Sequence, residues 1–453
     1  MRAAQQKSKR RRTPEGLEAR ELAVRLIAGV LADKKPFEQV QATCLAHPRT
    51  AQLEPRDRAF ARAIAATVLR RQGELEFVLA SFLEHPPRHE GRLWSILLTG
   101  TAQLVCLELP AHAVVDLAVE TARRDPRAHR FAKLVNAVLR RVAEHGRELL
   151  SGQDGVRLNV PDWLWLRWSA VYGEDTARRI ATASLTEAAL DISVKPGGGM
   201  SLEAWAERLG GRLLRTGSIR LPAHGRIEDL PGYGDGAWWI QDAGAALVAR
   251  VAGEVSGLSV ADLCAAPGGK TAALAAGGAH VTAVDFSAAR LARLRHNLER
   301  LRLSAEVVEA DAAAWAPRRS FDVVVLDAPC TATGTIRRHP DILRLKRAED
   351  VGRMALQQHA LLAHAGSLVR PGGRLVYSTC SLEPEEGAAQ IDAFLAAEAD
   401  FTRLPITANE IGGESEWVTS GGDLRTLPFH LPQEPQSLSG IDGFFVARLQ
   451  RRP

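Results

Sequence analysis

Two cysteines close to the ends of expected strands are the residues best suited to chemistry in this sequence. Cys330 follows the apolar run FDVVVLD, and Cys380 ends the run GRLVYSTC. In a doubly wound parallel sheet, ligands bind outside the carboxyl ends of the strands, so we expect both thiols to face one crevice. A single cysteine at a strand end is usually an inert core residue. A pair that meets at one ligand site instead favours covalent chemistry by a thiolate nucleophile.

A glycine-rich turn is expected to open the same crevice. The segment VADLCAAPGGKT runs from an expected strand into an expected helix, and its glycines let backbone amides and a helix N-terminus approach a ligand closely. The turn matches neither the GxGxxG dinucleotide pattern nor the GxxxxGK[ST] phosphate-binding loop, which disfavours dinucleotide and ATP chemistry. Asp285 and Asp311 end the next two strands. Two such carboxylates suit a ribose diol and an adenine amine, although either could instead cap a helix.

These residues need a sheet to position them. From Leu258 onward, strand patterns alternate with helix patterns, which is typical of a parallel sheet built by right-handed crossovers. The expected strands are 258–264, 280–285, 305–310, 321–327 and 374–380, and the late segment GIDGFFVARL is expected to add an edge strand or hairpin. We therefore predict a doubly wound α/β nucleotide-binding fold.

The preceding part of the chain has a different pattern. From Gly16 to about Glu148, apolar residues recur at i, i+3 and i+4, which predicts an all-α bundle. Its expected helices are 55–69, 73–82, 93–107, 113–123 and 130–144. Short strand and helix patterns on both sides of KPGGG predict a small α+β module. The predicted organisation is a basic tail at 1–15, a helical domain at 16–150, a module or linker at 151–240 and a catalytic domain at 241–453.

Composition places the chain among ordinary globular proteins. Of its 453 residues, 46% are hydrophobic and 25% charged. The longest uncharged apolar stretch, residues 93–107, is shorter than the 18 or so residues that indicate a membrane span, and no apolar signal region follows the basic start, so we expect a cytoplasmic protein. The five cysteines show no CxxC or paired-histidine spacing, which disfavours a disulfide framework and a structural zinc site.

Positive charge is concentrated in the first third. Residues 1–150 contain 26 Lys and Arg against 17 Asp and Glu, whereas the rest contain 32 against 36. This asymmetry indicates an anionic partner for the first third, with nucleic acid as the first candidate. The alternative is a solvated charged surface with no partner.

Several segments together resemble one enzyme family. DLCAAPGGKT, VVVLDAPCTATGT, RRHPDI, LVYSTCSLEPEE and DGFFVARL resemble, in order, the motifs of RNA cytosine-5 methyltransferases that use S-adenosylmethionine. ARELAVRLI, RDRAFARAIAATVL and FAKLVNAVLRRV resemble the helical RNA-binding domain of the NusB antitermination factor. The whole chain therefore resembles the RsmB (Sun, Fmu) branch, which modifies small-subunit ribosomal RNA. In the middle module, LDISVKPGG replaces an LRVN-type segment, which alters the expected RNA contacts but not the chemistry.

The resemblance implies a role for each site residue. Cytosine C5 is a poor nucleophile, so a thiolate must first add to C6. By resemblance, Cys380 makes that attack and Cys330 assists product release. Asp327 would bind either the cytosine edge at N3 and N4 or the methionyl end of the cofactor, and Lys270 would steady the site electrostatically. The residues implied to bind S-adenosylmethionine are Cys264, Ala265, Ala266, Pro267, Gly268, Gly269, Lys270, Asp285, Asp311 and Asp327.

Other residues bear on RNA binding and on adenine. Phe286 is expected either to stack near adenine or to be a core aromatic. Arg337, Arg338 and His339 are expected to track the RNA backbone while a flipped base is read in the pocket. The resemblance therefore implies methylation of C5 of one cytosine in 16S ribosomal RNA, and we expect no metal and no membrane partner. The alternatives are a transfer RNA cytosine-5 methyltransferase and a non-catalytic RNA-binding or assembly factor.

Overall fold

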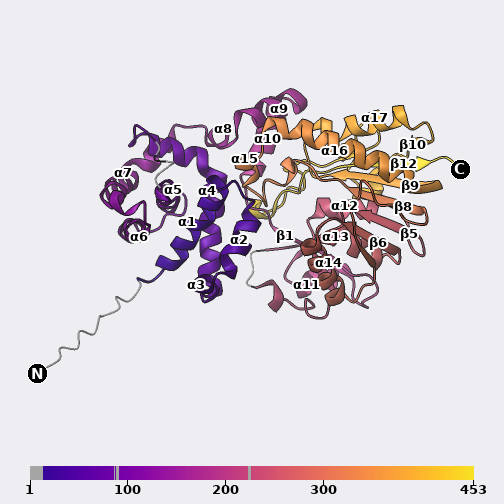
Figure 1. Ribbon diagram of the computed structural model, residues 1–453, viewed down its shortest axis with the longest axis horizontal. Helices are drawn as coiled ribbons and strands as arrows, with labels where there is room; N and C mark the ends of the chain where they lie inside the picture. The colour runs from indigo at the N-terminus through magenta and orange to yellow at the C-terminus, as the bar shows by residue number, and fades with distance from the viewer. Residues whose placement is uncertain (1–13, 86, 88–90, 223–225) are drawn as a thin grey trace, which may run out of the picture. The chain divides into compact units, whose positions relative to one another are not determined.

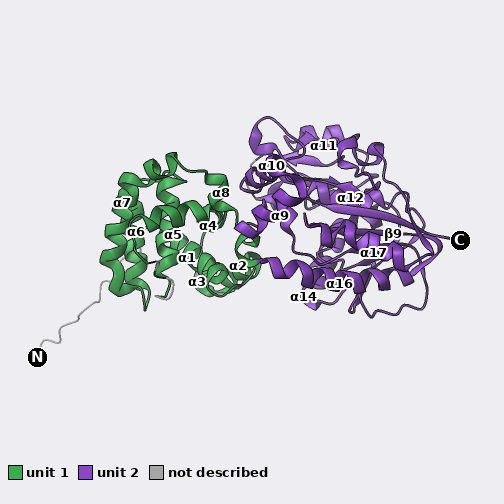
Figure 2. Cartoon of the chain, turned by 90° about the horizontal axis from the view of Figure 1, so that it is seen from above, with its two compact units in different colours: residues 1–161, 340–345 green, residues 162–339, 346–453 purple. Residues whose placement is uncertain are grey.

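The structure is a computed structural model that describes residues 14–85, 87, 91–222 and 226–453 (Figure 1). Nearly all of the basic tail expected at 1–15 lies outside these residues. The chain forms two compact units (Figure 2). The helical unit consists of Met1–Pro161 and Pro340–Leu345, and the catalytic unit consists of Asp162–His339 and Lys346–Pro453.

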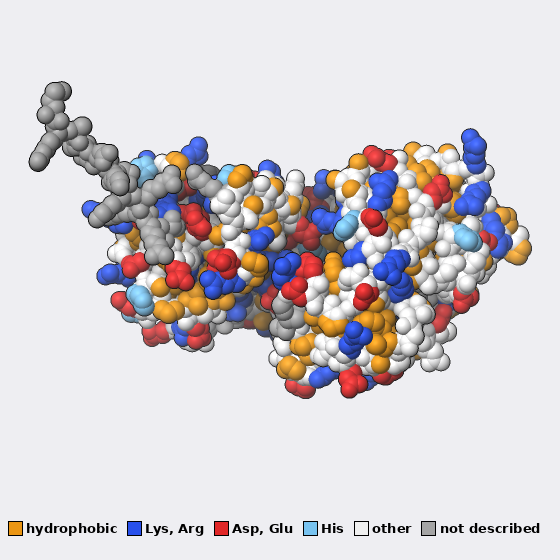
Figure 3. All heavy atoms as spheres, turned by 90° about the horizontal axis from the view of Figure 1, so that it is seen from below, with side chains coloured by type: hydrophobic (Ala, Val, Ile, Leu, Met, Phe, Trp, Pro, Cys, Tyr) orange, Lys and Arg blue, Asp and Glu red, His pale blue; other side chains and the backbone are white. Residues whose placement is uncertain are grey.

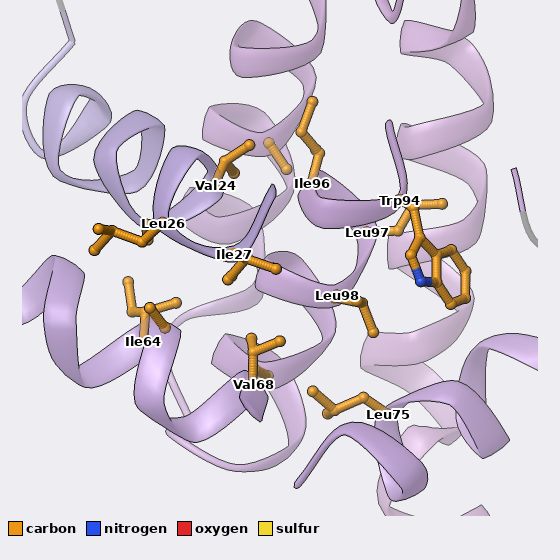
Figure 4. Close-up of a cluster of buried hydrophobic side chains, with 14 of the residues drawn as sticks. Val24, Leu26, Ile27, Ile64, Val68, Leu75, Trp94, Ile96, Leu97 and Leu98 are labelled. Atoms are coloured by element: carbon orange, nitrogen blue, oxygen red, sulfur yellow. The ribbon is translucent and has the colours of Figure 1, made fainter. Parts of the chain in front are cut away.

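The helical unit is a bundle around one apolar core. Its helices are α1 (Leu17–Leu31), α2 (Phe37–Ala46), α3 (Pro48–Ala51), α4 (Pro55–Ala80), α5 (Leu93–Val105), α6 (Ala111–Arg124), α7 (Ala132–Ser151), α8 (Gly155–Asn159) and α15 (Ile342–Leu345). Helix α5, the long apolar stretch of the sequence, is buried from Leu93 to Leu104. Figure 4 shows side chains of α1, α4 and α5 meeting in this core, including Ile27, Val68 and Leu98.

Helix α4 joins two helices that were expected to be separate. The sequence predicted helices at 55–69 and 73–82, and the structure confirms the break between them: Arg71 is non-helical, with φ −107° and ψ 18°, so α4 consists of two helices that meet at a kink. Gly73, two residues after the kink, is a point of close approach. A Cβ at Gly73 would lie 1.8 Å from the carbonyl oxygen of Leu158, so only glycine lets the backbone next to α8 come this near.

Residues 340–345 complete the helical unit although they come late in the chain. The Asp341 carboxylate accepts a 2.9 Å hydrogen bond from the backbone N–H of Phe37, the first residue of α2. Because the N-cap residue of α2 is a proline without a capping side chain, Asp341 supplies the missing acceptor. The Arg344 guanidinium donates to the carbonyl oxygen of Asn159 at 3.0 Å. Helix α15 has only four residues, which is too few to give a helical pattern in the sequence. The sequence therefore did not predict that residues 340–345 belong to the helical unit.

The catalytic unit contains a seven-strand path in the order β10-β12-β9-β8-β5-β6-β7. The strands are β5 (Ser259–Leu263), β6 (His280–Asp285), β7 (Glu306–Glu309), β8 (Phe321–Asp327), β9 (Val369–Thr379), β10 (Phe401–Arg403) and β12 (Phe445–Arg451), and β11 (Leu424–Arg425) pairs with β12. Strands β7, β6, β5, β8 and β9 are parallel, as the alternating pattern predicted. The segment GIDGFFVARL was expected to add an edge strand or a hairpin. The edge position was wrong, because β12 lies between β9 and β10, both antiparallel to it, and three-residue β10 was too short to predict. β12 also pairs antiparallel with β11.

Helices cover both faces of this sheet, which confirms the doubly wound fold. Alternate residues of each strand point to opposite faces. Val260, Val323 and Val376 pack against α12 (Ala243–Val251) and α13 (Gly269–Ala276). On the other face, Val324 and Leu375 pack against α16 (Ala348–Ser367) and α17 (Ala388–Ala397). Helix α14 (Ala288–Leu301) packs through its leucines against the turn that follows β5.

The same unit carries a small antiparallel sheet in the order β2-β3-β1-β4. Its elements are β1 (Leu190–Val194), β2 (Arg212–Leu213), β3 (Ile219–Leu221) and β4 (Trp238–Ile240), with α9 (Asp162–Tyr172), α10 (Glu174–Ser184) and α11 (Leu202–Arg208). In the segment LDISVKPGG, buried Asp191 accepts two 2.7 Å hydrogen bonds from Arg220. The same carboxylate accepts from the N–H of Ala243, at the start of α12. Asp191 therefore joins the small sheet to the catalytic fold.

Within the part of the chain that the structure describes, no helix is both long enough and apolar enough to cross a membrane.

Candidate active site

The structure brings the two expected cysteines into contact. Strands β8 and β9 are parallel neighbours, with Asp327 opposite Ser378. Cys330 lies three residues beyond Asp327, and Cys380 lies two residues beyond Ser378. Their Sγ atoms are 3.4 Å apart, and both cysteines are free thiols. One nucleophile and one proton-bearing thiol can therefore act on the same substrate atoms.

A buried carboxylate holds the two cysteine loops together. Glu386 is fully buried and accepts hydrogen bonds from the Thr331 N–H at 2.8 Å and from the hydroxyls of Thr331 and Ser381. Thr331 directly follows Cys330, and Ser381 directly follows Cys380. Gln358 of α16 donates to the same carboxylate at 3.1 Å. Glu386 thus fixes both loops relative to each other.

The surroundings of Cys330 favour its neutral thiol. The hydrogen bond with Cys380, burial, and the negative charges of Cys380 and Glu386 raise the pKa of Cys330 well above its usual value. At neutral pH, Cys330 therefore keeps its proton and can donate it in a hydrogen bond to the sulfur of Cys380.

Lys270 and Asp327 form an ion pair next to the cysteines. The Lys270 Nζ is 2.5 Å from Asp327 Oδ2, and the Ser378 hydroxyl donates to Asp327 Oδ1 at 3.0 Å. Burial disfavours the charged ammonium, but the Asp327 carboxylate outweighs it and raises the pKa of Lys270. A fixed positive charge therefore lies beside a carboxylate that is about a third exposed.

The glycine-rich turn leads from β5 into α13. Cys264 and Gly268 both adopt positive φ, at 60° and 103°. A Cβ at Gly268 would lie 2.9 Å from Leu294 of α14, so both the backbone conformation and the packing require glycine there. Burial raises the pKa of Cys264 to about 12, which keeps this thiol neutral and unsuited to nucleophilic attack.

The two strand-end carboxylates differ in their surroundings. Asp285 ends β6, is buried, and accepts backbone hydrogen bonds from Ala266 and Ser287 through different oxygens. Asp285 Oδ2 also pairs with the Arg290 guanidinium at 3.4 Å, so Oδ1 is the oxygen that can accept a second bond. Asp311 lies two residues beyond β7, is exposed, and accepts from the N–H of Ala313. Phe286 is 71% exposed, so the expectation that it is a core aromatic was wrong, and its ring lies open to solvent beside Asp285.

The expected RNA-tracking role does not suit Arg337. This side chain is 2% exposed and donates to the carbonyl oxygen of Ser439 at 2.6 Å, so it cannot follow an RNA backbone over the surface. It fills the space above Gly440, where a Cβ would lie 2.4 Å from the guanidinium. Arg338 is partly exposed and pairs with the buried carboxylate of Asp442.

Glu386 is the main site residue that sequence reasoning missed. It lies inside the motif LVYSTCSLEPEE, but the motif contains three glutamates, and nothing in their spacing tells which one binds both cysteine loops. In the structure, Glu383 and Glu385 bind Arg167 of α9, at 2.5 and 2.6 Å. Glu383 is also buried, so the hydrogen-bond partners, and not burial alone, distinguish Glu386 from its neighbours.

Comparison with known proteins shows where the chain belongs. The family described as 16S rRNA methyltransferase RsmB/F matches residues 253–450, and the NusB family matches residues 17–144. A solved structure of the protein PH0851 is similar in fold, with a TM-score of 0.76 at 22% identity, and the match covers 96% of this chain and 99% of that one.

Two curated relatives share more of the sequence. Ribosomal RNA small subunit methyltransferase B of Vibrio cholerae is 36% identical, covering 77% of this chain and 83% of the relative. The protein of the same name from Xanthomonas campestris is 35% identical, covering 96% of this chain and 97% of the relative. With this identity over nearly the whole length, the chain belongs to the ribosomal RNA small subunit methyltransferase B family.

Proposed function

We propose that this protein transfers a methyl group from S-adenosylmethionine to C5 of one cytosine in small-subunit ribosomal RNA, in the cytoplasm, through a covalent bond between Cys380 and C6. The observation that carries the proposal is the pair of free thiols 3.4 Å apart at the ends of adjacent parallel strands. A methyltransferase acting on a more nucleophilic atom needs no thiol, whereas C5 of cytosine requires a nucleophile at C6. Membership of the family supports ribosomal RNA as the substrate.

The residues at the carboxyl ends of β5, β6 and β7 suit S-adenosylmethionine, which supplies the methyl group as part of a sulfonium. Asp285 retains acceptor capacity on Oδ1 for a ribose hydroxyl, and the exposed ring of Phe286 can stack on adenine. The exposed carboxylate of Asp311 can accept from the adenine amine. The turn from Cys264 to Lys270 would surround the methionine part.

Each reacting residue has one task in the proposed sequence. The Cys380 thiolate bonds to C6, and the electron pair shifted onto C5 takes the methyl group. The C5 proton then leaves to a base, its electron pair restores the C5–C6 double bond, and the C6–S bond breaks. Cys330, kept neutral by its surroundings, donates its S–H to the Cys380 sulfur and stabilises the thiolate as it departs.

Asp327 is positioned by Lys270 and Ser378 to hold either the cytosine edge at N3 and N4 or the methionyl end of the cofactor. Lys270 contributes positive charge close to the reacting sulfur. The proposal also includes the organisation of residues 151–240 as a module joined to the catalytic domain at 241–453. Its support is the separate sheet of β1 to β4 and its contact with α12 through Asp191.

The test begins with the RNA of cells that lack the protein. Bisulfite sequencing should reveal one small-subunit cytosine that loses its methyl group, and the wild-type gene should restore it. If a transfer RNA lost its methyl group instead, transfer RNA would be the substrate. Unchanged methylation in all RNA would point to a non-catalytic factor.

Purified variants test the division of labour between the thiols. Cys380→Ala should neither methylate RNA nor form an adduct, because no bond to C6 can form. Cys330→Ala should attack and transfer the methyl group but stall before elimination, so a protein–RNA adduct should survive denaturing electrophoresis. The double variant should give no adduct, and Cys44→Ala in the helical unit serves as the control. If Cys380→Ala formed the adduct, Cys330 would be the nucleophile and Cys380 the residue that assists release. Full activity in both single variants would refute the covalent mechanism.

A further inference from the structure

The catalytic unit has a hollow that neither Cys330 nor Cys380 lines. It has a volume of about 550 Å3 and lies between α10 and the loop 428–440. We call it the arginine pocket, and define it by Arg178, Arg179, Thr182, Arg337, Phe429 and Glu434. Its size suits a small ligand or one nucleotide of a larger one. No residue of the mechanism proposed above lines it.

The walls of the arginine pocket are anchored to the cysteine loops. The hydroxyl of Tyr172, at the end of α9, donates to the carbonyl oxygen of Leu382 at 2.5 Å, and α10 packs on α9. Arg425, four residues before Phe429, donates to the carbonyl oxygen of Ser381 at 2.5 Å. Leu382 and Ser381 follow Cys380 directly.

The third wall continues the loop of Cys330. Arg337 lies seven residues after Cys330 and binds the carbonyl oxygen of Ser439 on the pocket's far side. A molecule held in the arginine pocket is therefore bounded by segments that lead directly from both reacting thiols. Two ligands must be near both thiols during catalysis, S-adenosylmethionine and the RNA strand that carries the target cytosine. Because the proposed function assigns the cofactor to the ends of β5, β6 and β7, the RNA strand is the ligand left for this pocket.

The chemistry of the arginine pocket suits a nucleotide. Arg178 and Arg179 are exposed on α10, and Glu434 is the one carboxylate among the lining residues that the structure describes. The Arg179 guanidinium lies 3.7 Å from the centroid of the half-buried Phe429 ring. Arginines bind phosphates, and splayed RNA bases stack on aromatic rings or on guanidinium planes.

On the face drawn in Figure 3, positive and negative side chains are interspersed among the described residues rather than gathered into one broad basic area.

We propose that the arginine pocket binds a nucleotide of the RNA strand next to the target cytosine, with its phosphate on Arg178 and Arg179 and its base against Phe429. The inference rests on the proposed function, because it takes the substrate to be RNA. It assigns the pocket a role in substrate binding, separate from the transfer of the methyl group.

Charge reversal in the full-length protein tests the pocket. R178E/R179E should raise the KM for a small-subunit ribosomal RNA transcript at least tenfold, with kcat and S-adenosylmethionine affinity nearly unchanged. The matched control is R293E/R295E, which makes the same charge change at two exposed positions of α14 and should alter the KM less than twofold. The salt dependence of binding should also weaken, by a slope of about 1 for each phosphate that the variant no longer binds. Equal effects of the two double variants would overturn the proposal.

A second variant changes the pocket in the opposite direction. Glu434→Gln removes an exposed negative charge from the pocket, so it should lower the KM for the transcript about two- to threefold, a gain that misfolding cannot produce. An unchanged or raised KM would count against phosphate binding in the pocket.

Direct binding separates this inference from the proposed function. A fluorescent 12-nucleotide single-stranded RNA and a poly-glutamate peptide serve as probes. If R178E/R179E weakens binding of the RNA but the wild-type protein methylates no ribosomal RNA, the proposed function fails and the pocket stands. The pocket inference fails if the wild type methylates its RNA while R178E/R179E binds the RNA probe as tightly as R293E/R295E does. It also fails if R178E/R179E weakens binding of the poly-glutamate peptide but not of the RNA.

Discussion

Replacing Glu386 tests whether a buried carboxylate sets the geometry of the two thiols. Glu386→Ala removes the acceptor of the Thr331 N–H and of one N–H of Gln358, whereas the two hydroxyls at the site, 3.1 Å apart, can bond to each other. Two buried donors left unpaired cost about 1–3 kcal/mol each, and the cavity adds to this. We expect a loss of about 3–6 kcal/mol in the free energy of unfolding.

Glu386→Gln separates geometry from charge. Its carbonyl oxygen can accept from Thr331 N–H and Gln358, and its amide can donate to the hydroxyls of Thr331 and Ser381, which rotate to accept. We expect a loss of only about 1 kcal/mol in stability. Single-turnover adduct formation should be near the wild-type rate, whereas in Glu386→Ala it should fall about 100-fold, because small displacements of reacting groups are costly.

The pH dependence gives a readout that a merely structural role would not change. The negative charge of Glu386 contributes to the raised pKa of Cys330. A neutral glutamine removes that charge, so the pKa of Cys330 should fall. If Cys330 acts as a neutral thiol, Glu386→Gln should lose activity on the alkaline side of its pH profile, and this loss should begin at a lower pH than in the wild type.

Glu385→Gln is the matched control, because it removes a half-exposed carboxylate one residue away that binds Arg167. It should leave both adduct formation and the pH profile unchanged. The reasoning would be refuted if Glu386→Ala formed adduct within twofold of the wild-type rate. It would also be refuted if Glu386→Gln were as inactive as Glu386→Ala.

Two further predictions concern the cofactor end of the sheet. Asp285→Ala should weaken S-adenosylmethionine binding at least tenfold, about 1.4 kcal/mol, and unchanged affinity in calorimetry would place the ribose elsewhere. Burial raises the pKa of Asp262 to about 7, although the hydroxyl of Thr271 opposes the shift. The folded state therefore retains a proton that the unfolded chain loses near pH 4, and this group lowers stability progressively from about pH 4 to pH 7. Asp262→Asn should raise the unfolding temperature more at pH 8 than at pH 5, and an equal effect at both values would contradict the shift.

The parts of the site that could be predicted from sequence lie at the ends of regular strands. Once FDVVVLD and GRLVYSTC were interpreted as parallel strands, the meeting of Cys330 and Cys380 followed from sheet geometry. The turn after β5 and the position of Asp285 followed in the same way. These features depend on local patterns and on one rule about strand ends.

The remaining features depend on contacts between distant segments. Glu386 reaches Thr331 across 55 positions, and the arginine pocket combines α10 with a loop some 250 residues later. No periodicity connects such segments. The expected exposure of Arg337 failed for the same reason, because the loop around Gly440 that covers it has no regular pattern.

The capping of α2 by Asp341 has a consequence for the order in which the protein is made. A ribosome has synthesised about three quarters of the chain before residues 340–345 are available. Domains generally fold as units, with the N-terminal one first. Here, the helical unit lacks an acceptor for the N–H of Phe37 and a partner for the Asn159 carbonyl until β5 to β8 have already been made. The unit that begins the chain is therefore among the last to be finished, and a fragment that stops at Pro161 would lack the segment that completes it.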